Sequence, residues 1–500
     1  MMRGRVVFGA VLISFVGLFV FNTFLSSVAT PTSSLHFLVP ATSSNHDLCK
    51  LLLSAAILRY PPPILINWGA LEDKENAYVQ HLAKVETILK YLDTLVAKGK
   101  KDDLALIVDG FDVHFQLPPE VMLQRYFEAN AAAQRRIDLQ VGADTAMSHG
   151  FKQSVIFGHD KLCWPIDARR PACWLVPLAS DRPFAFGPET DQAGMEKAKA
   201  RWLNSGTIMG PVGDIQEVFQ ATLALIQKKH VTDSDQFYFA NIYANQEYSR
   251  RLLQPEGFGV AMNRTDLDWP ELEPNQITER GIGIDYEGLL YQTMAFFHQS
   301  LAWITFDGAA ESLGSRPAKY LRLSTTKYHQ KVLPQDIQDS RPPFAAVAEK
   351  KTRSWIKAKA KAPEADSGPP LPAHLSWKDV SLGINVASNN IFPLLHFTGE
   401  KEYRDTWWPR MWYYPYGEAL LKASAGLKRS PLSKRVIGGK IWWPGEVVTR
   451  EETLASANDG DRVGAFADHG AFLSWEALCR THEPLLFPPK AKEEEDHPSL

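Results

Sequence analysis

The stretch LALIVDGFDVHF, from Leu104 to Phe115, decides the fold. It begins with an unbroken apolar run, Leu104 to Val108, which has charged residues before it and Gly110 soon after it. Such a short run predicts a strand that is buried on both faces, as the strands of a parallel sheet are. Two carboxylates, Asp109 and Asp112, follow directly, at the place where ligands bind in open α/β sheets.

These two carboxylates allow two interpretations. Oxygen ligands at a strand end suit a hard divalent cation, which keeps waters and substrate phosphates in the rest of its shell. Alternatively, Asp109 and Asp112 serve the chemistry of a turn around Gly110, whose missing side chain permits a sharp bend. Taken alone, the stretch favours neither the metal site nor the simple turn.

Composition excludes some classes of protein. With 500 residues, of which 45% are apolar and 22% charged, the chain has ordinary values for a folded protein with a large core or for two or three units. A net charge of −3 argues against a nucleic-acid binder, because it provides no strong positive field. Neither a GxGxxG motif nor a Walker lysine loop occurs, which disfavours dinucleotide enzymes and P-loop nucleotidases.

The first 29 residues predict a membrane anchor. Arg3 and Arg5 precede an uncharged run from Val6 to Phe21, and the chain stays largely apolar to Ala29. About 20 apolar residues are enough to span a bilayer. A cleaved signal peptide is the alternative, but the run is longer than the usual signal core. Basic residues keep this end cytoplasmic, so we expect a single-pass type II membrane protein of the Golgi or endoplasmic reticulum, with its bulk in the lumen.

A lumenal location gives meaning to the cysteines, because disulfides persist there. Cys163 and Cys173 enclose a short proline-containing loop, and we predict a bridge between them. Cys49 and Cys479 are left over; a second bridge across the ends of the chain is one option, which the sequence leaves open. A sequon that begins at Asn263 predicts N-glycosylation on a surface loop.

Strands and helices alternate from Leu35 to about Asp160. The predicted strands are His36–Val39, Ile64–Ile66, Leu104–Val108 and Val155–Phe157. The predicted helices are Asp47–Arg59 with Asp47 as N-cap, a long helix that has Leu82, Val85, Ile88, Leu89 and Leu92 on one face, and one near Pro119–Asn130. This alternation predicts βαβ units, hence an α/β fold with a mostly parallel sheet flanked by helices.

Further motifs point to a known family. They are VDGFDV (Val108–Val113), CWP (Cys163–Pro165), RWLNSGTIMGP (Arg201–Pro211), DSDQFYF (Asp233–Phe239), IGIDYEGLLYQTM (Ile282–Met294) and HFTGEK (His396–Lys401). In this order they resemble the glycosyltransferase domain of the collagen lysyl hydroxylase/glycosyltransferase family. The chain looks closer still to fungal membrane-anchored proteins related to that domain.

The resemblance implies a GT-A-like, Rossmann-type fold that uses a UDP-sugar and a divalent cation, with Mn²⁺ expected. Asp109 and Asp112 match the family's acidic motif and His396 its distant histidine, so these three are expected to hold the metal. Imidazole combined with carboxylates suits Mn²⁺, and the cation would neutralise the charge on the departing UDP. Lys401, with Gly399 in the same motif, is expected to reach the diphosphate as a point charge.

The same resemblance implies that other residues bind the donor, and each of them also has a structural interpretation. Asn204, Ser205 and Gly206 would face the sugar, where small residues permit a close approach, or would form a simple turn. Trp68 would stack on the uracil or pack in the core, with packing slightly favoured. Trp164 is expected in the core beside the predicted bridge.

Asp233 and Asp235 match the acidic stretch that faces the acceptor or the reacting sugar, and we expect them to act in catalysis. Their structural alternative is capping of the helix Gln236–Tyr248, because acids stabilise a helix N-terminus. Thr398 departs from the family, which usually has Asn at this position. A hydroxyl then replaces an amide, and this change bears on the acceptor more than on the metal site.

The rest of the chain divides into segments of different character. Residues 30–34 are expected to form a short stalk, 35–306 the nucleotide-sugar-binding region, 307–376 a partly disordered insertion, 377–487 the remainder of the catalytic domain and 488–500 a mobile tail. An aromatic cluster follows His396 and forms either an acceptor subsite or core, with core slightly favoured; its members are Tyr403, Trp407, Trp408, Trp412, Tyr413, Tyr414 and Tyr416.

The expected function is transfer of a sugar from a UDP-sugar to a glycan, protein or lipid acceptor in the secretory pathway. A hexose is the expected sugar. A non-catalytic lumenal binding module that keeps the fold is the alternative, and Thr398 and the long insertion support it. A metal-dependent phosphoesterase is a weaker third option, since it would need more metal ligands at other strand ends.

Overall fold

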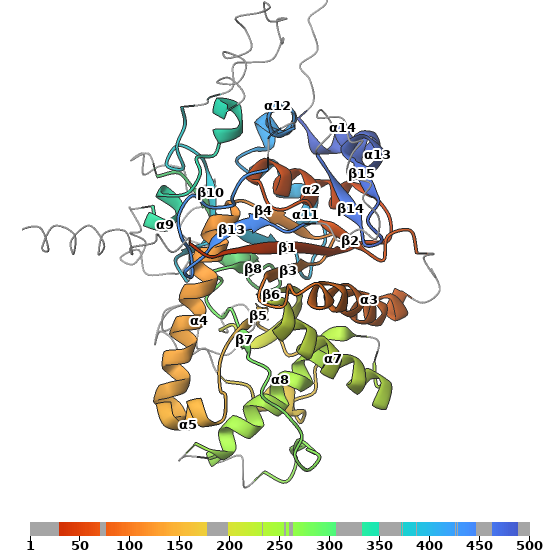
Figure 1. Ribbon diagram of the computed structural model, residues 1–500, viewed down its shortest axis with the longest axis vertical. Helices are drawn as coiled ribbons and strands as arrows, with labels where there is room; N and C mark the ends of the chain where they lie inside the picture. The colour runs from red at the N-terminus through yellow and green to blue at the C-terminus, as the bar shows by residue number, and fades with distance from the viewer. Residues whose placement is uncertain are drawn as a thin grey trace, which may run out of the picture.

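The structure is a computed structural model (Figure 1). It describes residues 30–488, apart from 71–76, 178–198, 233, 255–256, 260–263, 307–332, 350–371, 373, 387, 426, 428 and 447–462. The predicted anchor, Asp233, the sequon asparagine Asn263, most of the predicted insertion and nearly all of the predicted tail therefore lie outside the described residues. Of the helices that are described, none is long and apolar enough to cross a membrane.

A nine-stranded sheet forms the centre of the molecule, in the order β15-β14-β2-β1-β3-β6-β5-β7, with β13 paired to β1. The strands are β1 (Thr32–Pro40), β2 (Ile64–Ile66), β3 (Leu104–Val108), β5 (Val155–Asp160), β6 (Trp202–Pro211), β7 (Ile282–Ile284), β13 (Ile441–Pro444), β14 (Gly464–Ala467) and β15 (Phe472–Ser474). Only the pairs β3–β6, β5–β6 and β14–β15 are antiparallel among these described strands. The predicted α/β fold with a mostly parallel central sheet and flanking helices is therefore confirmed.

Alternation along β3 explains why both faces of the sheet carry helices. Leu104, Leu106 and Val108 belong to one core cluster, whereas Ala105 and Ile107 belong to the other. Successive strand side chains point to opposite faces, so an all-apolar strand must be covered twice. In Figure 1, α2 lies above the sheet, and α3, α7 and α8 lie below it.

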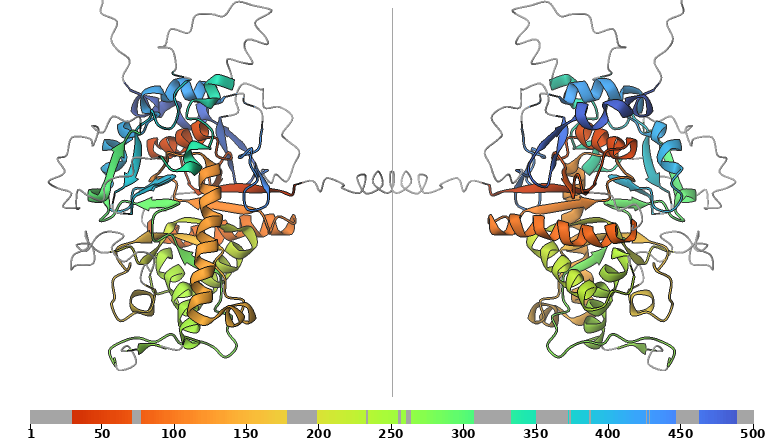
Figure 2. Two further views of the ribbon diagram at one scale, coloured as in Figure 1. Left: turned by 90° about the vertical axis from the view of Figure 1, so that its left-hand side faces the viewer. Right: turned by 90° about the vertical axis from the view of Figure 1, so that its right-hand side faces the viewer.

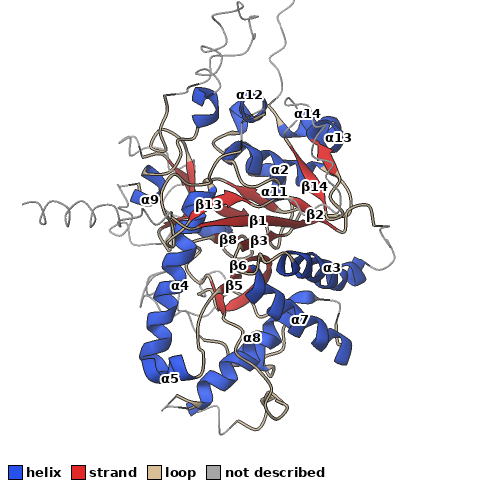
Figure 3. Cartoon of the chain, in the orientation of Figure 1, coloured by secondary structure: helices blue, strands red, loops and turns tan. Residues whose placement is uncertain are grey.

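The described helices have these bounds: α2 (His46–Leu58), α3 (Ala77–Ala97), α4 (Pro119–Val141), α5 (Ala143–Ser148), α6 (Pro171–Trp174), α7 (Val212–Lys228), α8 (Asp235–Leu252), α9 (Gln335–Gln338), α11 (Tyr403–Thr406), α12 (Gly417–Ser424), α13 (Trp475–Cys479) and α14 (Glu483–Leu486). Figure 2 shows α4 upright along one side of the molecule, and Figure 3 shows the strands as a central layer between helices.

Two small three-stranded sheets complete the fold. One contains β4 (Val113–Phe115), β12 (Leu394–His396) and β8 (Tyr291–Thr293), and the other contains β9 (Leu301–Ile304), β10 (Leu382–Asn385) and β11 (Asn390–Ile391). The first of these sheets brings a late part of the chain against the segment that follows β3.

Four local predictions need correction. The N-cap of α2 is Asn45, whose side chain accepts a hydrogen bond from the Leu48 amide (2.8 Å), because the helix begins before Asp47. The helix that starts at Pro119 is longer than predicted. Trp164 is 51% exposed and is not a core residue. Strand β1 begins at Thr32, so most of the predicted stalk is part of the sheet.

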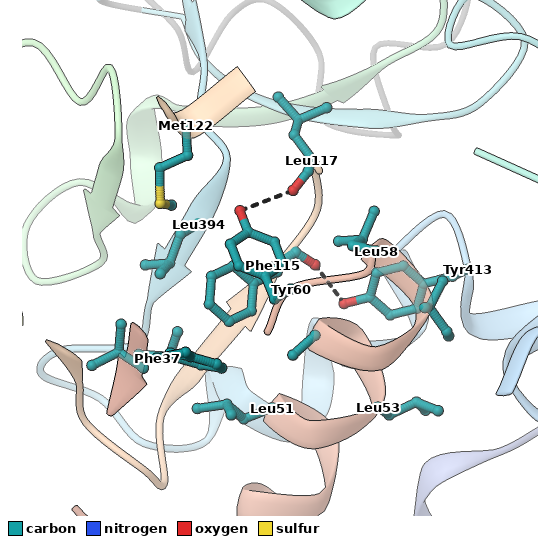
Figure 4. Close-up of a cluster of buried hydrophobic side chains, with 14 of the residues drawn as sticks. Phe37, Leu51, Leu53, Leu58, Tyr60, Phe115, Leu117, Met122, Leu394 and Tyr413 are labelled. Atoms are coloured by element: carbon teal, nitrogen blue, oxygen red, sulfur yellow. Dashed lines mark hydrogen bonds between the residues drawn. The ribbon is translucent and has the colours of Figure 1, made fainter. Parts of the chain in front are cut away.

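The aromatic residues after His396 are mainly core, as favoured. Trp407, Trp408, Trp412 and Tyr413 are buried, and the Tyr413 hydroxyl donates to the Phe115 carbonyl (2.8 Å). Figure 4 shows this contact beside Tyr60, Phe37 and Leu394. The aromatics therefore close the core over β4.

Both cysteine pairs form disulfides. Cys163 is bonded to Cys173, as predicted, and Cys49 is bonded to Cys479. The second bridge joins α2 to α13 and settles the option that the sequence left open.

Candidate metal centre

The three predicted metal ligands converge because β4 pairs with β12. Asp109 directly follows β3, and Asp112 directly precedes β4. In the antiparallel pair, His396 lies opposite Val113, the neighbour of Asp112. The Phe397 amide donates to the Asp112 carbonyl (2.8 Å), which extends this pairing by one residue. A late strand thus brings the imidazole to the two carboxylates.

The ligand atoms of Asp109, Asp112 and His396 all lie within 4.8 Å of one another. His396 Nε2 is 3.3 Å from Asp112 Oδ1 and 3.9 Å from Asp109 Oδ2. The His396 and Asp112 side chains are 3% and 12% exposed, whereas that of Asp109 is 36% exposed. The cluster is therefore walled on one side and open on the other, which leaves room for ligands such as water or phosphate oxygen.

Gly206 forms the wall of this cluster. A Cβ atom at this position would lie 2.2 Å from His396 Cε1 and 2.6 Å from Asp109 Oδ2. The Asp109 amide also donates to the Gly206 carbonyl (2.9 Å). The structure thus places β6 so close to His396 and Asp109 that only glycine fits at position 206. This close approach explains the predicted need for a small residue.

Asn204 and Ser205 are buried, and the Ser205 amide donates to Gln236 Oε1 (3.4 Å). Asn204 Nδ2 donates to Asp160 Oδ2 (3.0 Å), and its Oδ1 accepts from the Gly206 amide (3.0 Å). Burial raises the pKa of Asp160 to about 6. The Asn204 amide therefore supports the Gly206 backbone and is engaged by Asp160, a residue that sequence reasoning did not select.

Lys84 is a second residue that sequence reasoning missed. Its Nζ lies 3.0 Å from Asp109 Oδ1 and 2.8 Å from Asp235 Oδ2. Burial by itself would lower the pKa of Lys84, but Asp109 and Asp235 hold it well above its ordinary value. One signal was available: Lys84 stands four residues before Ile88, on the apolar stripe of α3, where a lysine needs a buried partner.

Lys84 connects Asp235 to the cluster. Asp235 is a buried residue in the first turn of α8, where an acid favours the helix N-terminus, but the N-cap itself is Ser234 and makes no side-chain cap hydrogen bond. Asp233, the other predicted carboxylate, lies outside the described residues.

Lys401 contacts the second carboxylate of the cluster, that of Asp112. Its Nζ lies 2.6 Å from Asp112 Oδ2 and donates to the Phe397 carbonyl (3.2 Å). Burial would raise the pKa of Asp112, but His396 and Lys401 hold it well below its ordinary value. Burial would lower the pKa of His396, but the Asp112 and Asp109 carboxylates hold it above its ordinary value.

The donor set fits a divalent cation. Two carboxylate oxygens and one imidazole nitrogen suit an ion of intermediate hardness such as Mn²⁺. Lys401 is half exposed beside Asp112 and can meet the negative charge of a bound anion, whereas Lys84 is held between Asp109 and Asp235. The arrangement can therefore hold a cation on its walled side and an anionic ligand on its open side.

The remaining predicted residues have structural contacts. Thr398 Oγ1 accepts from the Met294 amide (3.1 Å) and the Ala295 amide (2.9 Å). Gly399 has a φ of +77°, which a turn with glycine adopts without strain. Trp68 is partly buried against the core cluster on the α2 face, in agreement with the favoured packing role.

A cavity of about 470 Å³ lies elsewhere in the fold, between the end of α2 and the chain around β13 and β14. None of the predicted site residues is part of its lining. Its walls are largely apolar, with Arg59, Arg341 and Arg429 among the lining residues.

Comparison with known proteins gives no further assignment. No family model matches the chain, and no curated protein matches it either. A function for this chain therefore has to be inferred from the geometry of the site and from the sequence motifs.

Proposed function

We propose that this protein is a metal-dependent glycosyltransferase that moves a hexosyl group from a UDP-sugar to a glycan, protein or lipid acceptor. The single observation that carries the proposal is the convergence of Asp109, Asp112 and His396, whose ligand atoms lie within 4.8 Å of one another although β3 and β12 are far apart in the chain. The resemblance to the glycosyltransferase domain of the collagen lysyl hydroxylase/glycosyltransferase family supports the donor class.

Each residue has a role in this proposal. A cation held by Asp109, Asp112 and His396 would neutralise the charge that builds on the departing UDP. Lys401, an exposed ammonium beside Asp112, would bind the diphosphate as a point charge. Asp235, which Lys84 holds at the site, would orient the acceptor or the reacting sugar; Asp233 is proposed for the same task from its place in the sequence.

The cellular setting is part of the proposal. Residues 6–29 would anchor the protein in the membrane of the Golgi or endoplasmic reticulum, with the catalytic part in the lumen. The two disulfides support this location, because such bonds persist in the secretory lumen.

A non-catalytic lumenal binding module is the second candidate. Thr398 favours it, since its hydroxyl already accepts two backbone N–H bonds in place of the amide that the family presents at this position. Such a module would keep the fold and bind a ligand without turnover.

Calorimetry of UDP with the full-length protein, with and without Mn²⁺, tests the proposal. We expect binding that requires Mn²⁺ and disappears in Asp112→Ala and in His396→Ala. Asp214→Ala, which removes a surface partner of Lys152, and His149→Ala at an exposed histidine are matched controls that should bind like the wild type. If the folded protein binds no UDP, the proposal that it is a transferase is wrong. Metal-dependent hydrolysis of a UDP-sugar would overturn the binding module.

A further inference from the structure

A second ionic cluster lies behind the metal centre, at the start of α2. Asp47 is buried, and so is Lys50, whose Nζ lies 3.2 Å from Asp47 Oδ1 and donates to the Arg404 carbonyl (3.2 Å). Lys50 also bonds to the Asp405 carboxylate. Together with His46, these two acids lie close enough to hold a metal ion, but Lys50 and Arg404 already supply two positive charges there. The cluster is therefore an ion-pair network.

Arg404 connects this network to the segment from Asp109 to Asp112, which we call the metal loop. Its Nη1 lies 2.9 Å from Asp47 Oδ2 and donates to the Phe111 carbonyl (2.9 Å). Phe111 stands between the metal ligands Asp109 and Asp112. The carbonyl that Arg404 binds thus belongs to the short segment whose shape sets the separation of the two carboxylates.

The guanidinium of Arg404 also binds the turn that contains Lys401, the residue proposed to bind the diphosphate. Arg404 Nε donates to the Lys401 carbonyl (3.1 Å), while Lys401 Nζ lies 2.6 Å from Asp112 Oδ2. Arg404 therefore contacts three segments at once: α2 through Asp47, the metal loop and the Lys401 turn. A planar guanidinium can serve such divergent acceptors in a fixed geometry, whereas the compact ammonium of a lysine cannot.

We propose that Arg404 is a positioning residue that fixes the Asp109–Asp112 loop and the Lys401 turn in the arrangement that binds the cation. Asp47, a buried carboxylate, orients the guanidinium. Arg404 acts on the two segments through their backbone carbonyls, those of Phe111 and Lys401. This inference rests on the proposed function, because it assigns a task in the same metal site.

Mn²⁺ binding to the full-length protein, measured by calorimetry with the metal alone as the probe, tests this role. Outer partners of metal ligands typically contribute 10- to 100-fold in affinity. We expect Arg404→Lys, which keeps the charge, to weaken Mn²⁺ binding by at least about tenfold. Arg410→Lys is the matched control: Arg410 is an exposed arginine over Trp303 and Trp407, and this change should leave the dissociation constant unaltered.

A second variant covers the case in which Arg404→Lys does not fold. Asp47→Asn keeps the guanidinium and removes the charge that orients it, so we expect a smaller loss of Mn²⁺ affinity in the same direction. The rise in melting temperature on adding Mn²⁺ should shrink in both Arg404→Lys and Asp47→Asn but not in Arg410→Lys. A purely structural role would lower the melting temperature and leave this metal-dependent rise unchanged.

The outcomes separate this inference from the proposed function. If the wild type binds Mn²⁺ and Arg404→Lys binds it equally well, the positioning role is wrong and the metal site stands. If the folded wild type binds no Mn²⁺, the proposed function fails, and the positioning role fails with it.

Discussion

Gly206 lies so close to His396 that a Cβ atom there would sit 2.2 Å from the imidazole Cε1. Gly206→Ala should therefore push the imidazole away from the carboxylates and weaken Mn²⁺ binding by more than about tenfold, as for other supports of a metal ligand. Calorimetry with Mn²⁺ measures the effect. Gly213→Ala is the control, since its Cβ would meet only the Lys101 side chain and neighbouring backbone at 3.3 Å or more, in a helix that favours alanine. Unchanged affinity in Gly206→Ala would show that β6 does not constrain the site.

Lys84 lies between two carboxylates, so its removal should be costly unless another cation takes its place. Lys84→Met leaves the buried Asp235 without its charge partner, and we expect a loss of about 3–5 kcal/mol in the free energy of unfolding without metal. Because Mn²⁺ would neutralise Asp109, saturating metal should restore part of this loss. Urea denaturation with and without Mn²⁺ measures both values.

Lys152→Met is the control for that measurement. It removes a surface ion pair with Asp214 and should cost only about 0.2–1 kcal/mol, irrespective of metal. If Lys84→Met lost the same free energy of unfolding with and without Mn²⁺, the cation would not replace the charge of Lys84.

Asp160 should make stability fall as pH rises through weakly acidic values. Burial raises its pKa to about 6 from an ordinary value near 3.8, so the folded protein holds the proton more tightly than the unfolded chain. Its contribution to the free energy of unfolding is thus fully present below about pH 4 and is lost as pH rises to about 6. This loss amounts to about 3 kcal/mol at most. In Asp160→Asn the free energy of unfolding should fall less steeply over this window.

Urea titrations at a series of pH values test this dependence. Asp102→Asn, at an exposed carboxylate, should follow the wild-type profile. The same slope in Asp160→Asn and the wild type would show that Asp160 titrates normally.

The two disulfides should contribute unequally to stability. Cys49–Cys479 closes a loop with a sequence separation of 430, whereas Cys163–Cys173 spans only 10. In the chain-entropy model, stabilisation grows with the logarithm of loop length, so Cys49→Ala/Cys479→Ala should lose about twice as much free energy of unfolding as Cys163→Ala/Cys173→Ala. Denaturation of both double variants tests the ratio, and an equal loss would favour an enthalpic origin.

Local signals predicted the central sheet better than its surroundings. The bounds of β3 and β2 follow from short apolar runs, and these strands formed where the runs are. Trp164 was misplaced because nearness to a disulfide says nothing about exposure. The predicted N-cap Asp47 lies inside α2 because the helix begins at His46, and its carboxylate pairs with Lys50 and Arg404 instead.

Local sequence indicated Asp109 and Asp112 as candidate metal ligands at a strand end, whereas His396 was assigned to them only through the motifs. Nothing near His396 indicates that β12 pairs with β4, since that register depends on packing across the whole fold. On a sequence, Arg404 resembles a solvated residue of a helix, and the place of Lys84 on the apolar stripe of α3 indicates only that it needs a buried partner. Their roles depend on partners that the fold alone brings near, such as Asp235 and the Phe111 carbonyl.

The pairing of β4 with β12 has a consequence for biosynthesis. During translation, the segment with Asp109 and Asp112 leaves the ribosome long before His396 exists, so a growing chain cannot bring these three side chains together. Strands β13 and β14, which cover edges of β1 and β2, arrive later still, and Cys479 follows them. The three side chains can thus meet only after His396 has been made, and chains that stop before that residue would carry open sheet edges and an incomplete cluster.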